Sequence, residues 1–191
     1  MIISEDYNFI FVHVPKTGGN SVNKALEEFN SSRHGRPYGV GMHRYLSTVD
    51  KKTRWDKFAF GFVRNPWDRI CSMYHFRVQK KNASQPPEKE LLIQRGFEKS
   101  VLMWEVGPDQ QEQMNYLEGC DFIGRFETLQ YDLNHICDVI GIERRRLEHL
   151  NSSEHKDYRT YYTPEMVEVV EKNNIRTIER FGYTFEDPDS I

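Results

Sequence analysis

The 191-residue chain contains little cysteine, and it has neither a long apolar run nor a large excess of one charge. Its three cysteines, Cys71, Cys120 and Cys137, form no closely spaced metal-binding pair, and an odd number cannot all be bridged to one another. We therefore expect free thiols in a reducing compartment. Because no apolar run approaches the roughly 20 residues of a membrane-spanning helix, we also expect no membrane segment.

The charge balance and the first residues narrow the range of partners. A net charge of −3 argues against general binding to nucleic acid or to an anionic membrane surface. Clustered basic residues are then expected to serve a local anionic ligand. The amino terminus lacks a charged n-region followed by an apolar h-region, which predicts a cytoplasmic protein unless a targeting segment has been removed. The length suits one domain over residues 1–191.

Residues 9–21 are the most informative part of the sequence. Phe9 to Val14 predict a strand buried on both faces, because apolar residues are nearly continuous there. A helix behind this strand is predicted by four apolar residues at three- and four-residue spacing: Val22, Ala25, Leu26 and Phe29. Residues 18–20 then lie at the amino end of the helix, where unpaired N–H groups and the helix dipole favour an anion. With the charge of Lys16, the turn predicts a phosphate or sulfate site.

The nucleotide loop of the P-loop NTPases is missing from this turn. A Walker A sequence has a glycine, four further residues, and then glycine, lysine and serine or threonine. Here Lys16 precedes the glycines, so a triphosphate cradle is disfavoured although the order of strand, turn and helix is the same. An ordinary strand-to-helix turn is the alternative, with glycine supplying a positive φ angle and a solvated lysine.

Strands and helices alternate along the rest of the chain, which predicts an α/β fold with a mainly parallel sheet. The expected strands cover residues 9–14, 58–63 and 122–126, and the expected helices after the first cover residues 66–79, 88–104, 129–140 and 163–181. Asn65 as a cap and Pro66 in the first turn mark one helix start, and Gly141 marks a helix end. Residues 31–57 and 79–88 are expected to be loop inserts.

A second basic residue that could bind an anion follows the strand expected at 58–63. Arg64 leaves the carboxyl end of that strand, which is where ligands gather in open α/β sheets. Ser72 lies eight residues further on, about two helical turns along the next helix. Arg64 and Ser72 are therefore candidates for a phosphate site. Alternatively, Arg64 pairs with Asp68, and Ser72 is a surface hydroxyl.

These two motifs resemble the nucleotide loops of a known enzyme family. Val-Pro-Lys-Thr-Gly-Gly-Asn-Ser at 14–21 and Phe-Gly-Phe-Val-Arg-Asn-Pro-Trp-Asp-Arg-Ile-Cys-Ser-Met-Tyr at 60–74 resemble those of sulfotransferases that use 3′-phosphoadenosine 5′-phosphosulfate (PAPS), especially the carbohydrate and short bacterial branch. The resemblance continues through 122–129, 150–163 and 181–183, and leaves out 79–109. It implies a three-layer α/β sandwich like that of the P-loop NTPases, with a central mainly parallel sheet flanked by helices.

The resemblance also implies roles for individual residues. The 5′-phosphosulfate would be held by the turn and the helix start: Lys16, Thr17, Gly18, Gly19, Asn20 and Ser21. Arg64 and Ser72 would hold the 3′-phosphate. Phe126 matches the aromatic residue that contacts adenine, and Tyr158 and Arg159 fall in a late loop that closes over the donor. For these last three the alternatives are a core phenylalanine at a strand end and a solvated loop.

The implied reaction transfers a sulfuryl group to an acceptor hydroxyl or amine and leaves adenosine 3′,5′-bisphosphate. Lys16 would stabilise the charge that builds on the leaving phosphate. His43, in a Gly-x-His segment similar to that of short sulfotransferases, is the candidate base, with an exposed loop imidazole as the alternative. His13 is expected to be a core histidine. No triphosphate needs bridging and no Asp-rich motif is present, so we expect no metal.

The acceptor is expected to be a small molecule or glycan. Gln110, Gln111 and Tyr116 could line an acceptor cleft, but a solvated turn is the simpler expectation for them. Two other functions stay open from the sequence. One is a small P-loop kinase, which would need a magnesium-linked triphosphate loop, and the other is a nucleotide-binding module of the same fold without catalysis.

Overall fold

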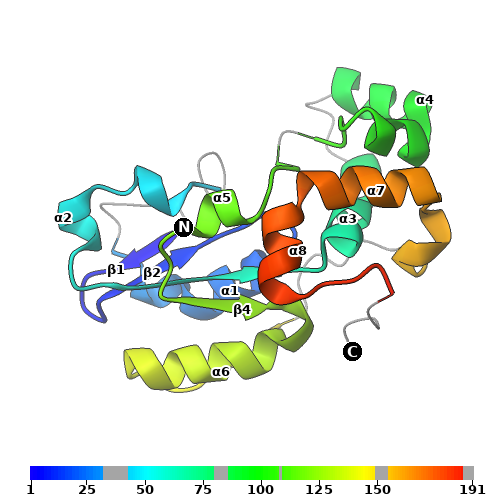
Figure 1. Ribbon diagram of the computed structural model, residues 1–191. Coiled ribbons are helices and arrows are strands. Elements are labelled where there is room, and N and C mark those ends of the chain that lie inside the picture. The colour runs from blue at the N-terminus through cyan, green and yellow to red at the C-terminus, as the bar shows by residue number, and fades with distance from the viewer. Residues whose placement is uncertain (32–42, 80–85, 108, 149–154, 187–191) are drawn as a thin grey trace. The chain divides into compact units, whose positions relative to one another are not determined.

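The computed structural model describes residues 1–31, 43–79, 86–107, 109–148 and 155–186, apart from the side chains of 86–88 (Figure 1). Its residues form two compact units. The first consists mainly of Met1–Arg64 and Gln113–Asn151, and the second of Asn65–Glu112 and Ser152–Asp189. Residues 80–85 of the insert predicted at 79–88, and residues 32–42 of the insert predicted at 31–57, lie outside the described residues. The described part of the insert at 31–57 is not all loop, because residues 46–48 and 51–54 form short helical turns.

The first unit contains a four-stranded sheet in the order β1, β2, β3, β4. These strands are Ile2–Ser4, Phe9–Val12, Phe58–Val63 and Phe122–Arg125. β2, β3 and β4 are parallel, whereas β1 pairs antiparallel with β2. All residues of β2 are buried, as the continuous apolar run predicts. The antiparallel strand β1 was not predicted, because three residues are too few to show a periodic pattern.

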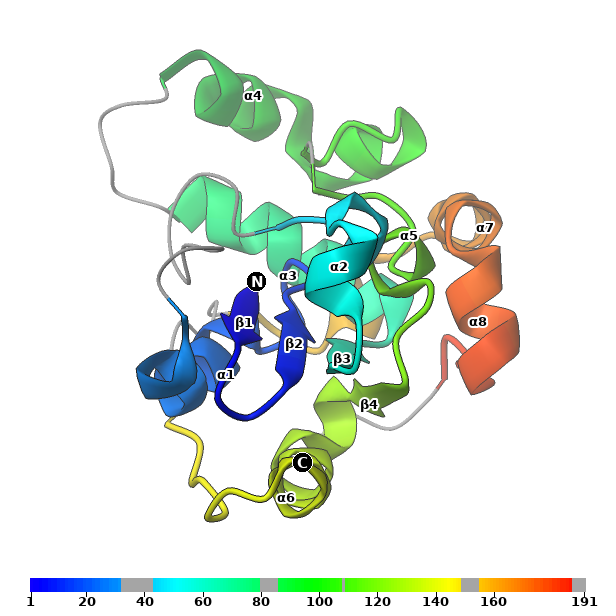
Figure 2. The ribbon, with the colours of Figure 1, turned by 90° about the vertical axis from the view of Figure 1, so that its left-hand side faces the viewer.

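Helices cover both faces of this sheet (Figure 2). The helical segments of the first unit are α1 Gly19–Leu26, η1 Glu27–Phe29, η2 Leu46–Thr48, α2 Lys51–Arg54, α5 Met114–Leu117, η3 Phe126–Thr128 and α6 Leu129–Ile140. On one face, Phe11 and Phe60 share a buried cluster with residues of α1 and α6. On the other, Gly61 lies against Leu117 of α5. An α/β fold with a mainly parallel sheet flanked by helices is confirmed, whereas the P-loop-like sandwich stays a prediction.

The second unit is helical. Its segments are α3 Pro66–Gln79, α4 Pro86–Leu102, η4 Tyr158–Tyr161, α7 Pro164–Asn173 and α8 Ile175–Phe181. α3 has the predicted bounds because Asn65 caps it: the Asn65 side-chain oxygen accepts from the backbone N–H of Trp67 at 3.1 Å and of Asp68 at 3.3 Å. The Trp67 indole donates to the carbonyl of Val167 at 3.1 Å, which joins α3 to α7.

Two helix predictions need correction. The expected single helix at 163–181 is two helices, which break at Asn174 with φ −131° and ψ 24°. The Asn174 side chain donates to the carbonyl of Val170 at 3.0 Å, so a side-chain bond forms where the helix is interrupted. The helix expected at 88–104 begins at Pro86, and it is interrupted at Gly96, which has a non-helical backbone with φ 75°.

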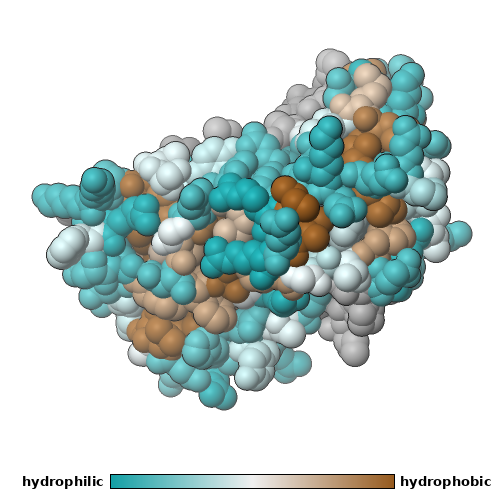
Figure 3. All heavy atoms as spheres, in the orientation of Figure 1, coloured by the Kyte–Doolittle hydropathy of each residue, from teal (hydrophilic) through white to brown (hydrophobic). Residues whose placement is uncertain are grey.

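The surface agrees with the charged composition. The face drawn in Figure 3 is mainly hydrophilic, with small apolar areas between polar side chains. Exposed large apolar residues nevertheless occur in both units, among them Trp55 and Ile93. Within the described part of the chain, no helix combines the length and the apolar composition that crossing a membrane requires.

Candidate functional site

The turn between β2 and α1 is tight and left-handed at two positions. Lys16 has φ 67° and Gly18 has φ 75°, and the Thr17 hydroxyl donates to the carbonyl of Val14 at 3.0 Å. The N–H of Ser21 already donates to the carbonyl of Gly18 at 3.0 Å, so α1 begins directly behind the turn. The N–H groups of Gly19 and Asn20 have no acceptor within α1 by position, and a helix start of this kind favours an anion.

The two glycines of the turn are required by close packing. A Cβ atom on Gly18 would lie 2.6 Å from Leu129 Cδ2 and 3.2 Å from Phe126 Cδ2. A Cβ atom on Gly19 would lie 2.0 Å from Cδ2 of His13. The distance to His13 is far below ordinary contact, and those to Leu129 and Phe126 are tighter than ordinary contact, so a side chain at either position would displace its neighbours. The glycine pair therefore lets the backbone of the turn approach both His13 and Phe126.

Arg64 lies against this turn. Its guanidinium donates to the carbonyl of Lys16 at 3.1 Å, and its Cζ atom is 4.2 Å from the centroid of the Phe126 ring. The first unit thus brings together the turn at Lys16, the cation that follows β3 and the aromatic ring that follows β4. These are three of the positions that the sequence selects, and their roles toward a ligand stay predictions.

Gln113 holds the backbone of Arg64, and sequence reasoning missed it. The Gln113 side-chain oxygen accepts from the Arg64 N–H at 3.0 Å, and its amide donates to the Arg64 carbonyl at 2.8 Å. Gln113 is completely buried. This pair of bonds joins positions 49 residues apart, so no local pattern could reveal it.

His43 lies beside His13. Their ring centroids are 4.8 Å apart with an interplanar angle of 89°. His13 is 3% exposed, and its Nδ1 atom accepts from the Asn23 amide at 3.2 Å. Burial, followed by the proximity of His43, holds the pKa of His13 well below its usual range. His13 is therefore a buried, hydrogen-bonded histidine as expected, but it also contacts the candidate base.

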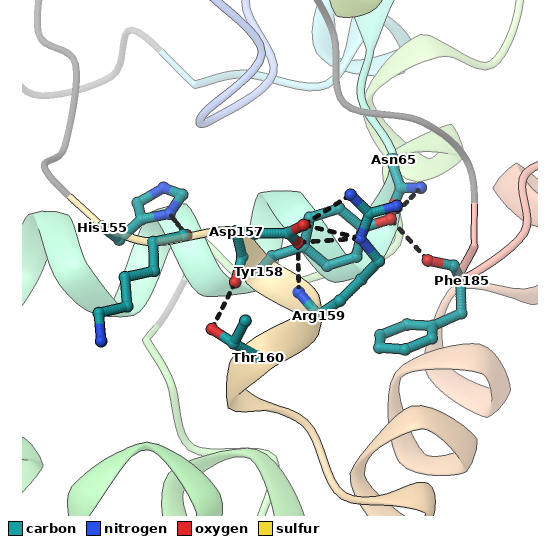
Figure 4. Close-up of polar contacts among 8 residues, drawn as sticks. Asn65, His155, Asp157, Tyr158, Arg159, Thr160 and Phe185 are labelled. Atoms are coloured by element: carbon teal, nitrogen blue, oxygen red, sulfur yellow. Dashed lines mark hydrogen bonds and ion pairs between the residues drawn. The ribbon is translucent and has the colours of Figure 1, made fainter.

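The remaining predicted donor-binding residues belong to the second unit. Ser72 lies on α3 and is buried, which is at odds with a surface hydroxyl. Tyr158 and Arg159 lie in η4, and Figure 4 shows the Arg159 guanidinium facing the carboxylate of Asp157. Arg159 Nη2 donates to that carboxylate at 2.6 Å, and these bonds lower the pKa of Asp157. Contact of these three residues with a donor stays a prediction.

The Tyr158 hydroxyl is engaged within the second unit. It donates to the carbonyl of Phe185 at 2.6 Å and accepts from the Asn65 amide at 3.4 Å (Figure 4). The Tyr158 ring also meets the Phe185 ring nearly edge to face, with centroids 5.7 Å apart. These contacts fix η4 to the segment that follows α8. Tyr158 is thus a structural anchor of its unit, whatever it contributes to a ligand.

Of the three residues considered for an acceptor cleft, Tyr116 differs from a solvated turn. Tyr116 is 3% exposed and packs against Tyr45, with ring centroids 4.7 Å apart. The expectation of a solvated turn is wrong for Tyr116, because α5 covers a face of the sheet. Gln110 instead closes a local turn, since its side-chain oxygen accepts from the N–H of Gly107 at 2.8 Å. Gln111 is exposed.

Comparison with known proteins decides the family. The model of the sulfotransferase family matches residues 1–184. The chain belongs to the sulfotransferase family. The match runs through both units and covers the turn at Lys16 and the strand exit at Arg64, so the predicted sulfotransferase family is confirmed. A comparison with the curated proteins gives no match.

Proposed function

We propose that this sulfotransferase takes the sulfuryl group from PAPS and transfers it to a hydroxyl of a carbohydrate or another small acceptor. The observation that supports this most strongly is the contact of Arg64 with both the Lys16 carbonyl and the Phe126 ring. A cation, an aromatic face and a helix start within one unit suit a ligand that combines an adenine with separate anionic groups.

The turn at Lys16 would bind the 5′-phosphosulfate. Transfer breaks the bond between sulfur and the bridging oxygen and forms a bond between sulfur and the acceptor oxygen. Negative charge then grows on the leaving phosphate, where the Lys16 ammonium and the N–H groups at the start of α1 would stabilise it. Lys16, Gly18 and Asn20 are half-buried, so they alternate with the buried Thr17, Gly19 and Ser21.

His43 would take the acceptor proton. A base of this kind contributes about 10²- to 10⁴-fold to the rate when it reaches the reacting hydroxyl. His43 is half-buried, and its contact with His13 places it beside a ring that lies against the first residue of α1. Arg64 would bind the 3′-phosphate of the donor, and Phe126 the adenine.

We also propose that the chain acts as a single domain in the cytoplasm. The family match across both units supports one functional domain. None of the three cysteines is in a disulfide, which suits a reducing compartment. The acceptor would then be a hydroxyl-bearing metabolite or glycan of that compartment.

A thermal-shift experiment tests the choice of donor. Adenosine 3′,5′-bisphosphate without magnesium should raise the melting temperature, and at a hundred times its Kd the stabilisation is about 2.7 kcal/mol. ATP with magnesium should have little effect. Lys16→Ala should weaken binding about tenfold or more, because a hydrogen bond to a charged group contributes about 1.5–3 kcal/mol. Lys24→Ala is the matched control, since Lys24 is exposed on α1 and pairs with Glu27.

The possible outcomes separate the candidate functions. Stabilisation by magnesium and ATP alone would indicate a kinase and contradict the proposal. Stabilisation by adenosine 3′,5′-bisphosphate must be accompanied by transfer of labelled sulfate from PAPS to some member of a panel of oligosaccharides and phenols. Binding without any transfer would instead indicate a non-catalytic module. His43→Ala should slow transfer about 10²- to 10⁴-fold and leave the thermal shift unchanged.

A further inference from the structure

We propose that His13 is a positioning residue that holds the candidate base His43 at the start of α1, an inference that rests on the proposed function. The feature behind it is the pair of imidazole rings, whose centroids lie 4.8 Å apart and whose planes are nearly perpendicular. His13 comes directly after β2 and before the turn.

The His13 ring is fixed on three sides. It stacks on the Phe11 ring, with centroids 5.9 Å apart and an interplanar angle of 18°. Its Cδ2 and Nε2 atoms lie against the backbone of Gly19, where a Cβ atom would come within 2.2 Å of Nε2. Its Nδ1 atom accepts from the amide of Asn23, which is completely buried on α1. The ring therefore follows the position of α1 closely.

The bond to Asn23 also sets the tautomer of His13. With the Asn23 amide oriented as it is, its nitrogen donates to Nδ1 of His13, which corresponds to a neutral ring whose single proton lies on Nε2. Burial supports the same state, since it holds the pKa of His13 far below its usual value. At neutral pH His13 is thus a rigid ring without charge.

An uncharged neighbour suits a base. After His43 has taken the acceptor proton it is a cation, and a second cation in contact with it would disfavour that state. A neutral ring avoids this repulsion, and its edge-to-face packing restricts rotation of the His43 ring. Since Cδ2 and Nε2 of His13 lie against Gly19, the contact keeps His43 beside the residues proposed to hold the phosphosulfate.

A double-mutant cycle tests whether His13 acts through His43. The variants are His13→Phe, His43→Ala and both together, assayed with labelled PAPS and the best acceptor from the panel. His13→Phe keeps a flat ring but removes the Asn23 acceptor. We expect kcat to fall about 10- to 100-fold, the cost of a small misplacement of a reacting group, with the KM for PAPS changed less than about twofold. In the His43→Ala background, the same substitution should have no further effect.

A purely structural role predicts the opposite pattern. His13→Phe would then lower kcat by the same factor in both backgrounds, and this result would overturn the proposal. The matched control is His135→Phe, because His135 is an exposed histidine on α6 and should leave kcat unchanged. If His13→Phe fails to fold, Asn23→Ala replaces it, since that variant removes the same hydrogen bond.

A second measurement does not depend on turnover. In protein with isotope-labelled histidine, NMR should show His13 as the neutral Nε2–H tautomer at pH 7, and relaxation should show an ordered His43 ring that becomes mobile in Asn23→Ala. An unchanged His43 ring in that variant would overturn the positioning role. Absence of both transfer and stabilisation by adenosine 3′,5′-bisphosphate in the wild-type protein would instead refute the proposed function, so the two failures are distinguishable.

Discussion

At the scale of single residues, the turn at Lys16 depends on contacts that only glycine permits. Gly18 combines a left-handed backbone with packing against Phe126 and Leu129, whereas Gly19 is needed only because His13 lies so close. Lys16 itself has φ 67°, a conformation that few non-glycine residues adopt and that is often found at functional sites. The turn is thus held in its shape by its surroundings.

Gly19→Ala tests this close packing. The added methyl group would collide with the His13 ring, and overpacking of this kind costs about 1–3 kcal/mol. We expect a lower urea midpoint together with weaker binding of adenosine 3′,5′-bisphosphate and slower transfer. Gly141→Ala is the control, because Gly141 has φ 74° with open space around it. Gly141→Ala should lower stability but leave ligand binding and transfer unchanged. Normal ligand binding by Gly19→Ala would refute the tight contact.

At the scale of elements, local signals predicted α3 and β3 with their observed bounds. Both depend on neighbouring residues, since Asn65 and Pro66 start α3 and a continuous apolar run makes β3. The break between α7 and α8 was missed because part of its cause lies far away in sequence. The Glu112 carboxylate accepts from the N–H of Arg176 at 3.1 Å and of Thr177 at 3.4 Å, and so it caps α8 from another segment.

In the candidate site, too, local motifs could be recognised from the sequence, whereas contacts between distant segments could not. The glycines, Lys16 and Arg64 were recognised from local motifs, and the structure places them in one unit. Gln113 and the His13–His43 pair could not be found this way, because they depend on packing between distant segments. Ser72 was selected by its spacing from Arg64, and Tyr158 and Arg159 by the family resemblance. The contact of these second-unit residues with a donor stays a prediction.

Glu112→Ala tests the cap on α8. Loss of the carboxylate leaves two N–H groups at the helix start without this acceptor, and loss of an N-terminal cap costs about 0.5–2 kcal/mol. We expect a correspondingly lower urea midpoint. Glu112→Gln, which keeps an acceptor oxygen without the charge, should lose less stability than Glu112→Ala. An unchanged midpoint in Glu112→Ala would show that α8 does not depend on this contact.

At the scale of the whole molecule, each unit contains a histidine that resists protonation. Burial lowers the pKa of His13 in the first unit and of His75 in the second. When the pH falls below 6.5, the ordinary pKa of histidine, these two histidines bind protons in the unfolded chain but stay neutral in the folded protein. Their contribution to stability is therefore complete above about pH 6.5 and is lost as the pH falls.

His75→Phe should reduce this sensitivity to acid. Among the described residues, His75 Nε2 is buried without a hydrogen-bond partner, and the ring packs against Phe97 and Tyr161. Phenylalanine preserves this packing and removes the protonation site. We expect the melting temperature of His75→Phe to fall less between pH 7 and pH 5 than that of the wild type. At pH 7 the two melting temperatures should be the same. An undiminished fall would exclude His75 as a source of the acid effect.

A crystal structure with bound adenosine 3′,5′-bisphosphate would decide whether this protein uses PAPS as its donor. We predict the 5′-phosphate at the amino end of α1 beside Lys16, the 3′-phosphate on the Arg64 guanidinium and the adenine against Phe126. A ligand bound elsewhere, or one with both phosphates away from Lys16 and Arg64, would contradict the proposed chemistry.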